Sequence, residues 1–191
     1  MKTFNDELTQ HITVMQCAAQ CSDVVQEAVL LLIATFKRGN KVLLCGNGGS
    51  AADAQHIAAE FVVRYEKKRR ALPAIALTTD SSILTAHAND FEFDSVFARQ
   101  IEALGNAGDT LIAISTSGNS NNILQAAHAA KAKGLNVIAL TGETGGALVD
   151  VSTLTIKVPS TVTARIQETH ILIGHYWCGV VEGSSDVSQS A

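Results

Sequence analysis

The sequence predicts an α/β protein, built as a three-layer αβα sandwich around a five-stranded parallel sheet. Three observations predict this fold class. Short aliphatic runs with few charges alternate with helical patterns along the chain, as expected for strands that helices cover on both faces. Aromatic residues make up only 5% of the chain, so the core must be built from small aliphatic side chains. The 191 residues fit one domain, and a globule of that size buries about 70% of its unfolded surface.

The elements of the sandwich follow in chain order. Strands are predicted at Lys41–Cys45, Ala74–Leu77, Thr110–Ser115, Asn136–Thr141 and Thr153–Val158. Helical patterns at about Ser50–Tyr65, Asp94–Leu104 and Ser120–Lys133 separate them, and Gly134 ends the last of these helices. Parallel strands that are joined by crossover helices form a three-layer sandwich.

Extra N- and C-terminal helices are predicted outside this repeat, at about Asn5–Lys37 and Thr163–Glu182. The second helix has more apolar residues than one buried stripe needs, so we expect it to pack against another subunit, with Ile173 at the interface. We place no domain boundary within residues 1–183. The Ser-rich residues 184–191 are predicted to form a disordered tail.

Charge and hydropathy exclude several classes of function. The net charge of −4 gives no support for binding a nucleic acid, and the basic run Arg64–Arg70 is interpreted as a solvated loop. The longest apolar run, Ala28–Phe36, holds nine residues, whereas a membrane span needs about 20. The N-terminus interleaves polar residues and lacks the pattern of a signal peptide, so we expect a cytoplasmic protein with no membrane partner and with reduced cysteines.

A glycine-rich loop follows the first predicted strand. Gly46, Gly48 and Gly49 fall within four positions, and Ser50 is expected to cap the helix that follows. The amides and the dipole of a helix N-terminus favour an anion, so this loop is interpreted as a phosphate cradle. It matches neither the P-loop nor the dinucleotide fingerprint, and a tight turn that binds no ligand remains the alternative.

A hydroxyl-rich loop follows the third predicted strand. Ser115, Thr116, Ser117 and Ser120 gather there, at the edge of the sheet where open α/β sheets bind ligands. Hydroxyls and amides, rather than lysines, indicate a neutral cup for one phosphate monoester. A cluster of helix-capping residues is the alternative interpretation.

Two helices carry acid–base groups. His56, Glu60 and Arg64 are spaced i, i+4 and i+8, which places them on one face of the helix after the glycine loop. In the C-terminal helix, Glu168 and His175 share a face and Gln167 lies some 80° around, in an otherwise apolar stretch. After the second strand, Asn89 and Asp90 either line a polyol site or form turns.

The ordered motifs resemble the sugar isomerase (SIS) domain family over about residues 5–183. The resemblance rests on Cys45-Gly-Asn-Gly-Gly-Ser50, Leu72-Pro-Ala-Ile-Ala-Leu77, Ala88-Asn-Asp90, Ile114-Ser-Thr-Ser-Gly-Asn-Ser120, Leu140-Thr-Gly142 and Arg165-Ile-Gln-Glu168. It implies a flavodoxin-like SIS fold and a cytoplasmic homotetramer. It also implies an aldose–ketose isomerase that converts sedoheptulose 7-phosphate to D-glycero-manno-heptose 7-phosphate, the first step of ADP-heptose synthesis for lipopolysaccharide or surface polysaccharide.

The same resemblance implies roles for individual residues. Glu60 would be the catalytic base and His175 the catalytic acid. The residues implied to bind the sugar phosphate are Asn47, Gly48, Gly49, Ser50, Arg64, Asn89, Asp90, Ser115, Thr116, Ser117, Ser120 and Gln167. His56, Glu60, Gln167 and His175 match the positions that bind one zinc ion per subunit, although a glutamine ligand makes such a site weaker than a histidine-rich one.

The alternative function is a non-catalytic SIS-domain tetramer that binds the replication initiator protein. In that branch of the family, other residues replace those at positions 60 and 175. This chain has Glu60 and His175 together with Gly48-Gly49-Ser50 and Ser117-Gly118, and a shared catalytic role accounts for all of them. A sugar-phosphate-sensing regulator would carry a DNA-binding domain, for which 191 residues leave no room. The enzyme is therefore the favoured interpretation.

Overall fold

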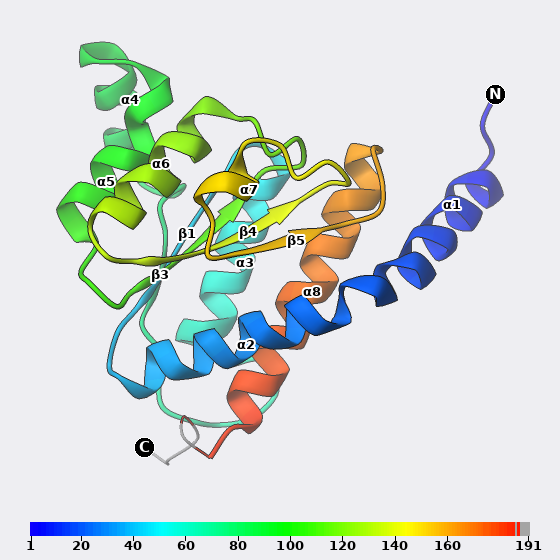
Figure 1. Ribbon diagram of the computed structural model, residues 1–191, viewed down its shortest axis with the longest axis horizontal. Coiled ribbons are helices and arrows are strands. Elements are labelled where there is room, and N and C mark those ends of the chain that lie inside the picture. Colours follow the sequence, from blue (N-terminus) through cyan, green and yellow to red (C-terminus); the bar gives the residue numbers. More distant parts are fainter. Residues whose placement is uncertain (186, 188–191) are drawn as a thin grey trace.

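The computed structural model describes residues 1–185 and 187. Its centre is one five-stranded sheet, with strands β1 (Val42–Gly46), β2 (Ala74–Ala76), β3 (Thr110–Ile114), β4 (Asn136–Thr141) and β5 (Leu154–Lys157). The strand order is β2-β1-β3-β4-β5 and every pair is parallel (Figure 1). All five predicted strands are confirmed, and the order is that of flavodoxin-like folds.

Helices cover both faces of the sheet. The first face is covered by α2 (Ser22–Lys37), α3 (Gly49–Val62) and α8 (Thr163–Gly183). The second is covered by α5 (Val96–Leu104), α6 (Asn121–Ala132) and the short α7 (Leu148–Val151). The remaining elements are α1 (Phe4–Cys17), η1 (Ala18–Cys21), α4 (Ser81–Asp90) and η2 (Phe93–Ser95). The predicted three-layer sandwich is confirmed.

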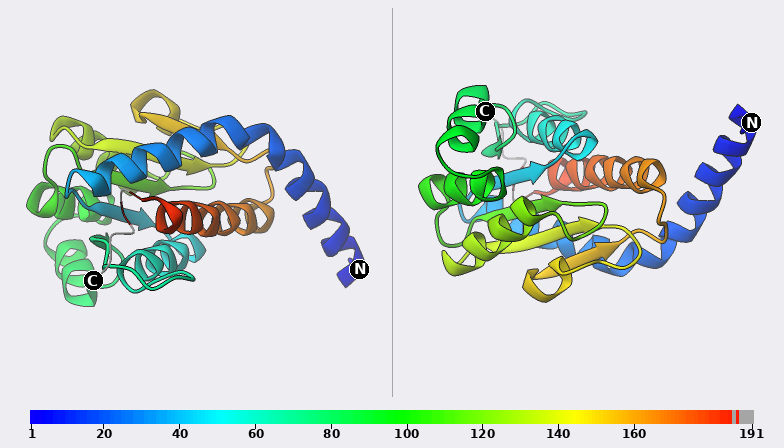
Figure 2. Two further views of the ribbon diagram at one scale, coloured as in Figure 1. Left: turned by 90° about the horizontal axis from the view of Figure 1, so that it is seen from below. Right: turned by 90° about the horizontal axis from the view of Figure 1, so that it is seen from above.

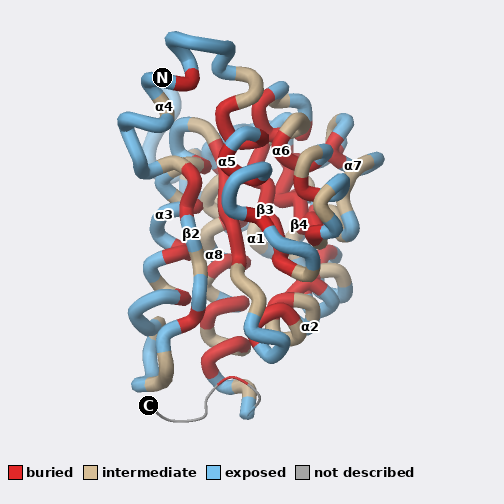
Figure 3. The backbone as a smooth tube through the Cα atoms, turned by 90° about the vertical axis from the view of Figure 1, so that its left-hand side faces the viewer, coloured by how far each residue is buried: buried red, intermediate tan, exposed pale blue. Residues whose placement is uncertain are grey.

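The alternation of side chains along each strand builds two separate cores. Val42 and Leu44 of β1 contribute to the cluster under α2, α3 and α8. Leu43 and Cys45, which point the opposite way, contribute to the cluster under α5 and α6. All of these side chains are fully buried, and the central strands form the buried middle of the molecule (Figure 3). Burial raises the pKa of the Cys45 thiol to about 12, so this cysteine packs as a small hydrophobe.

The sheet brings the two predicted ligand loops together. Residue Gly46 at the end of β1 is in register with Ile114 at the end of β3, so the loops that follow them start side by side. The chain turns to opposite faces of the sheet after these two strands, into α3 and into α6. This place is the topological switch point, where open α/β sheets bind ligands. The helices α3, α6 and α8 all begin at this same edge, because each follows a strand of the parallel sheet.

The helices α3 and α8 lie side by side and run parallel. A Cβ added at Gly49 would meet the amide of Gln167 at 2.7 Å, and one at Gly174 would meet Ile57 at 2.5 Å. The contacts therefore occur in the same order along both helices. Because Gly174 has no side chain, the two helix backbones approach closely at their middle. This close approach brings His56 and His175 within reach of each other.

Two features of the local structure correct the predictions. Helix α4 was not predicted: Asp80 caps it by accepting from the amide of Ile83 (3.0 Å), so Asn89 and Asp90 lie in a helix rather than in turns. Ser50 was expected to cap α3, but it lies inside the first turn. Gly48 takes the N-cap position with a φ of 54°, a conformation that glycine adopts without a steric cost.

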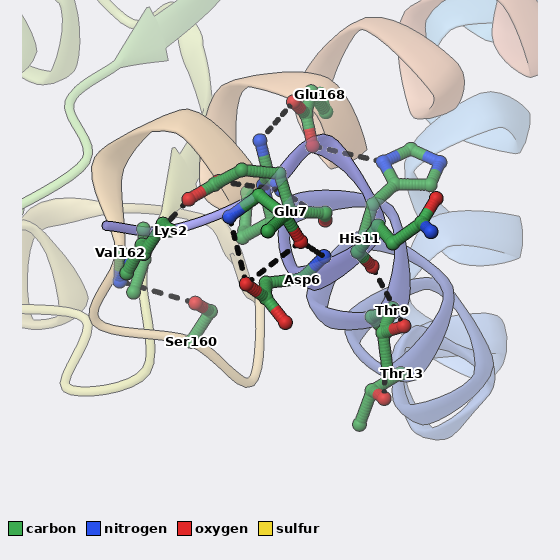
Figure 4. A network of polar contacts seen from close by, with 12 residues as sticks. Lys2, Asp6, Glu7, Thr9, His11, Thr13, Ser160, Val162 and Glu168 are labelled. Atoms are coloured by element: carbon green, nitrogen blue, oxygen red, sulfur yellow. Dashed lines mark hydrogen bonds and ion pairs between the residues drawn. The ribbon is translucent and has the colours of Figure 1, made fainter.

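The terminal helices differ from each other in how they are held. Most of α1 projects from the body (Figures 1 and 2), and only Val14 of it is buried. Arg165 of α8 donates to the carbonyl of Glu7 (2.7 Å) and to Glu168 (2.7 Å), which in turn pairs with His11 (2.8 Å; Figure 4). This polar network joins α1 to α8.

The burial of residues in the terminal segments differs in part from what the sequence predicts. Ile173 was expected at a subunit interface, but it lies in the core of the chain with 7% exposure, because it faces α2 and the sheet. The exposed apolar residues of α8 are Leu172 and Tyr176. Of the predicted tail, Val187 is buried, and residues 186 and 188–191 lie outside the described part. The stretch Phe4–Lys37 meets the length and hydropathy criteria of a membrane span, although α2 within it packs on the sheet.

Candidate active site

Two asparagines link the loops at the switch point. The side-chain amide of Asn47 donates to Asn122 (2.9 Å), and that of Asn122 donates back to Asn47 (2.8 Å). Asn122 is buried in the first turn of α6, and the sequence analysis did not single it out. The reciprocal pair fixes the glycine loop after β1 against the start of α6. A ligand at the switch point would therefore meet the two loops as one surface.

The hydroxyls after β3 form a cluster, as the sequence predicts. Ser115 Oγ lies 3.0 Å from Ser120 Oγ and 3.5 Å from Ser117 Oγ, and the hydroxyl of Ser117 also accepts from the amide of Asn119 (3.1 Å). Gly118, with a φ of 67°, turns the chain here and contacts the backbone of Gly145, where no Cβ fits. Loop backbone and hydroxyls of this kind suit a phosphate, which accepts many hydrogen bonds.

A small pocket opens beside the serine cluster. It has a volume of about 260 Å³ and is lined by loop residues after β3, β4 and β5 and by the first turn of α8. Thr116 and Ser117 contribute to its wall together with Glu143, Ser160 and Thr163. The larger pocket, of about 610 Å³, lies elsewhere. It opens between α8 on one side and η1 and α2 on the other, and its lining includes Leu172 and Tyr176. Of these two pockets, the small one lies at the edge where open α/β sheets bind ligands.

Acid–base groups meet where α3 and α8 are closest. His56 Nε2 lies 3.2 Å from Glu60 Oε1 and 3.2 Å from His175 Nε2. The imidazoles of His56 and His175 meet edge to face, and the ring of Tyr65 stacks on that of His175. His56 is exposed, whereas Glu60 and His175 are half-buried. Glu60 and His175, for which the family resemblance implies the roles of base and acid, thus lie close together within one chain.

Asp53 adds a carboxylate that the sequence analysis missed. It lies one turn before His56 on α3, and its Oδ2 atom is buried without a hydrogen-bond partner among the described residues. Burial raises the pKa of Asp53, and the nearby His56 and His175 partly offset that rise. The i, i+3 spacing from His56 was the available signal. A half-buried carboxylate with one unpartnered oxygen near two imidazoles is a candidate for a functional site.

The cluster His56–Glu60–His175 fits a metal ion. One donor atom from each residue lies within 4.8 Å of the others. The two 3.2 Å separations match the spacing of about 3.3 Å between donors of a tetrahedral zinc ion with bonds of about 2.0 Å. Two imidazole nitrogens and a carboxylate are also a donor set that zinc accepts while it keeps one open position. The described residues therefore offer three ligands for a metal.

The other residues from the sequence analysis lie in different places. Gln167 lies against Gly49 at the start of α3, which by helix geometry is roughly 10 Å along the axis from His56. Arg64 does not share the face of His56 and Glu60, because α3 ends at Val62; its guanidinium instead donates to the carbonyl of Glu66 (3.2 Å). Without a strong helix former at Val62 or Val63, the predicted continuation to Tyr65 does not form.

Four more polar residues lie outside the cluster. Asn89 and Asp90 are exposed at the end of α4, where the amide of Asn89 donates to Asp90 (2.8 Å), and α4 stands at an outer corner of the molecule (Figure 1). Glu168 is engaged in the network that holds α1. His170 is buried, with its Nε2 atom 3.1 Å from the carbonyl of Thr141. Burial lowers the pKa of His170 to about 4, so it is a neutral core residue.

Fold and site together define a class of protein. The molecule is an α/β domain with a cluster of hydroxyls and amides at its switch point and a histidine–carboxylate cluster between two parallel helices. A family model for the SIS domain matches residues 3–142, which is most of the chain. The chain belongs to the SIS domain family, and the resemblance deduced from its motifs is confirmed.

Individual relatives share most of their length with this chain. The phosphoheptose isomerase of Rhodospirillum rubrum is 54% identical over 162 residues, which cover 85% of this chain and 86% of the relative. That of Shewanella sp. (strain ANA-3) is 47% identical and is matched over 94% of its length. The solved structure of the phosphoheptose isomerase from Neisseria gonorrhoeae superposes with a TM-score of 0.89, at 43% identity, covering 93% of this chain and 96% of that one.

Proposed function

We propose that this chain is a phosphoheptose isomerase, which converts sedoheptulose 7-phosphate to D-glycero-manno-heptose 7-phosphate through an enediol. The observation that carries the proposal is the contact of Glu60, His56 and His175 beside the switch point of an SIS-domain chain whose relatives bear this name. The adjacency of Glu60 and His175 favours the enzyme over the initiator-binding alternative, in which both positions differ.

The reaction moves one proton between two neighbouring carbons. Glu60 removes a proton from C1 of the ketose and returns it to C2, while His175 gives a proton to O2 and accepts one from O1. The electron pair of the C1–H bond forms the C1–C2 double bond of the enediol, and the reverse flow forms the aldehyde at C1. A base over the carbon and an acid at the oxygen are the groups that such a transfer requires.

Binding is assigned to the sheet edge. Ser50, Ser115, Thr116, Ser117 and Ser120 would hold the phosphate, and the neighbouring loops would orient the sugar. For that sugar contact we propose Asn47, Gly48, Gly49, Arg64, Asn89, Asp90 and Gln167. Because Asn89 and Asp90 lie on α4, away from the cluster, their contribution requires either a movement of α4 or a neighbouring subunit. The phosphate contacts keep the reacting carbons near Glu60.

The metal is part of the proposal. His56, Glu60 and His175 would hold one zinc ion per subunit, and for Gln167 to complete the set the start of α8 would have to shift toward the cluster together with its side chain. When bound, zinc polarises the sugar oxygens and stabilises charge on them. A glutamate that is tightly ligated cannot act as a free base in the same state. Glu60 would therefore have to leave the metal, or bind it weakly, when it takes the proton.

The test is direct. Purified protein is incubated with sedoheptulose 7-phosphate in deuterated water, and NMR follows aldoheptose formation and deuterium at C2. Aldoheptose is expected, with deuterium at C2 in the fraction of turnovers in which the proton on Glu60 exchanges with solvent before it is returned. A protein that binds the sugar phosphate and still gives neither product nor exchange would refute the proposed reaction. In parallel, zinc is expected to raise the Tm of the wild-type chain and not that of His56→Ala, because only the native set binds the ion.

We also propose a cytoplasmic homotetramer that folds as a single domain over residues 1–183 and binds neither nucleic acid nor a membrane. The apolar groove between α8 and α2 supports the assembly, because Leu172 on its wall is 52% exposed in a single chain. Leu172→Glu is expected to lower the mass seen in sedimentation, since a charge on an exposed site leaves the core intact. Ile173 is unsuitable for this test, because it is buried within the chain.

A further inference from the structure

The loop after α3 places an aromatic ring on His175. The rings of Tyr65 and His175 stack with their centroids 5.6 Å apart and an interplanar angle of 22°. The Tyr65 ring also lies over α8 at Gly179, where an added Cβ would be 3.5 Å from its Cε1 atom. His175 thus contacts two rings, that of Tyr65 by stacking and that of His56 edge to face. No other described residue stacks on its ring.

A buried carboxylate fixes the position of that loop. Glu182, at the end of α8, is 2% exposed and accepts hydrogen bonds from three consecutive backbone amides, those of Tyr65 (3.0 Å), Glu66 (2.7 Å) and Lys67 (2.7 Å). Burial alone would raise the pKa of Glu182, but these amides outweigh it and leave the pKa lowered. The group is therefore ionised, and as an anion it binds the amides strongly.

Arg69 connects the same loop to α3. Its Nη2 atom donates to the carbonyl of Glu60 (2.7 Å), and its Nε atom lies 3.4 Å from Glu182 Oε1 without forming a hydrogen bond. The side chain is only 1% exposed. One guanidinium thus touches the backbone of the proposed base and the carboxylate that orders the loop. The loop, α3 and α8 are held as one unit.

We propose that Tyr65 is a positioning residue for His175, and that Glu182 and Arg69 hold Tyr65 in place. The inference rests on the proposed function for its kinetic meaning, but the geometry exists without substrate. An imidazole on a half-buried helix face has two torsions to fix, and stacking on one side restricts both. Catalytic groups lose rate steeply when their orientation is loosened, so a ring that restricts His175 supports turnover rather than binding.

The experiment compares Tyr65→Leu with its matched control, Tyr65→Phe. The Cε1–H resonance of His175 is read by NMR in metal-free protein at one fixed pH, and is assigned with His175→Gln. A proton over an aromatic ring face shows a ring-current shift. Tyr65→Phe is expected to retain the wild-type shift, and Tyr65→Leu is expected to lose it. Unchanged resonances in Tyr65→Leu would show that the two rings do not stack in solution, and would overturn the inference.

Steady-state kinetics of the Tyr65 variants provide the second measurement. In Tyr65→Leu, kcat is expected to fall about 10- to 100-fold with KM nearly constant, whereas Tyr65→Phe should restore kcat. A parallel rise in KM with constant kcat, or full activity of Tyr65→Leu, would contradict a positioning role. If the wild type itself fails to turn over the heptose phosphate, the proposed function fails, and the NMR comparison still tests the stack.

The anchor is tested separately with Glu182→Gln and the control Glu66→Gln. The control removes a carboxylate from the same loop but keeps the amide that binds Glu182. Glu182→Gln is expected to weaken the ring-current shift of His175 and to lower kcat in the same direction as Tyr65→Leu, while Glu66→Gln leaves both unchanged. If Glu182→Gln folds with an unaltered His175 resonance, Glu182 is not the anchor. If Glu182→Gln does not fold, Arg69→Lys is measured in the same way. A weakened ring-current shift of His175 and a lower kcat would support the anchor, and an unaltered His175 resonance would contradict it.

Discussion

The switch point and the α3–α8 cluster are built from different kinds of interaction. The switch point consists of loop backbone, neutral hydroxyls and the reciprocal amide pair of Asn47 and Asn122. The cluster consists of titratable side chains on two rigid helices, at donor separations of 3.2 Å. The first region suits the binding of an anion, and the second suits proton transfer or metal binding. In the proposed function, anion binding and proton transfer therefore fall to separate regions of the molecule, and mutations can test each region in turn.

The largest expected effect comes from Glu60→Gln, which acts only on the cluster. Turnover should fall by about 10²–10⁴-fold, because the variant lacks the base, while the affinity for a sugar phosphate stays close to that of the wild type. Deuterium exchange at C2 measures the first effect and calorimetry measures the second. A variant that loses both in proportion would mean that the two regions are not separable.

The buried His170 of α8 predicts a pH dependence of stability that can be distinguished from any contribution of the cluster. The pKa of buried His170 is lowered to about 4, from 6.5 in an unfolded chain, so the unfolded state takes up the proton first. Stability is complete above pH 6.5 and is lost as the pH falls toward 4, by about 3 kcal/mol in total.

Urea unfolding at pH 7 and pH 5 measures this loss, of which about 2 kcal/mol should appear between the two values. In His170→Gln, whose amide can still donate to Thr141, that part of the pH dependence should disappear. An identical pH dependence in the variant would place the acid sensitivity in other groups, including those of the cluster.

Gly174→Ala tests whether close helix packing assembles the cluster. Its Cβ would lie 2.5 Å from Ile57 in the fully buried core, so α3 and α8 must move apart, at a cost of about 1–3 kcal/mol in unfolding free energy. Zinc binding should weaken more than phosphate binding. Gly183→Ala, at the exposed end of the same helix with nothing within 4 Å of the new atom, is the control.

The smallest effect is expected at the switch point. Ser120→Ala removes one hydroxyl of the serine cluster, so KM should rise about tenfold with kcat nearly unchanged, since a single hydrogen bond to a charged group contributes about 1.5 kcal/mol. Steady-state kinetics decides the matter. A fall in kcat alone would assign Ser120 to the chemical step and weaken the division between the two regions.

Local sequence patterns predicted most of the fold and part of the candidate site. Strands buried on both faces appear in the sequence as aliphatic runs, and glycine and serine loops after them identify the switch point. The cluster was found in part, because His56 and Glu60 are one turn apart on one helix. Helix α4, which Asp80 caps, was missed because the segment after the second strand was interpreted as a polyol site or as turns.

The remaining site residues were not predictable from local patterns. Glu182 binds the amides of residues 65–67 from more than 110 positions away, and no spacing rule relates such positions. The same holds for the pair Asn47 and Asn122, which only the register of β1 with β3 brings together. The end of α3 at Val62 was missed because the helical pattern continues without a stop signal.

The convergence of three helix N-termini on one sheet edge has a consequence for ionic strength. The partial positive charges of α3, α6 and α8 act within about one helical turn, whereas the net charge of −4 acts over the Debye length of about 10 Å in 0.1 M salt. A doubly charged phosphate is thus weakly repelled at a distance and attracted only on contact. Added salt should speed its association slightly, while dissociation, governed by the short-range contacts, changes little.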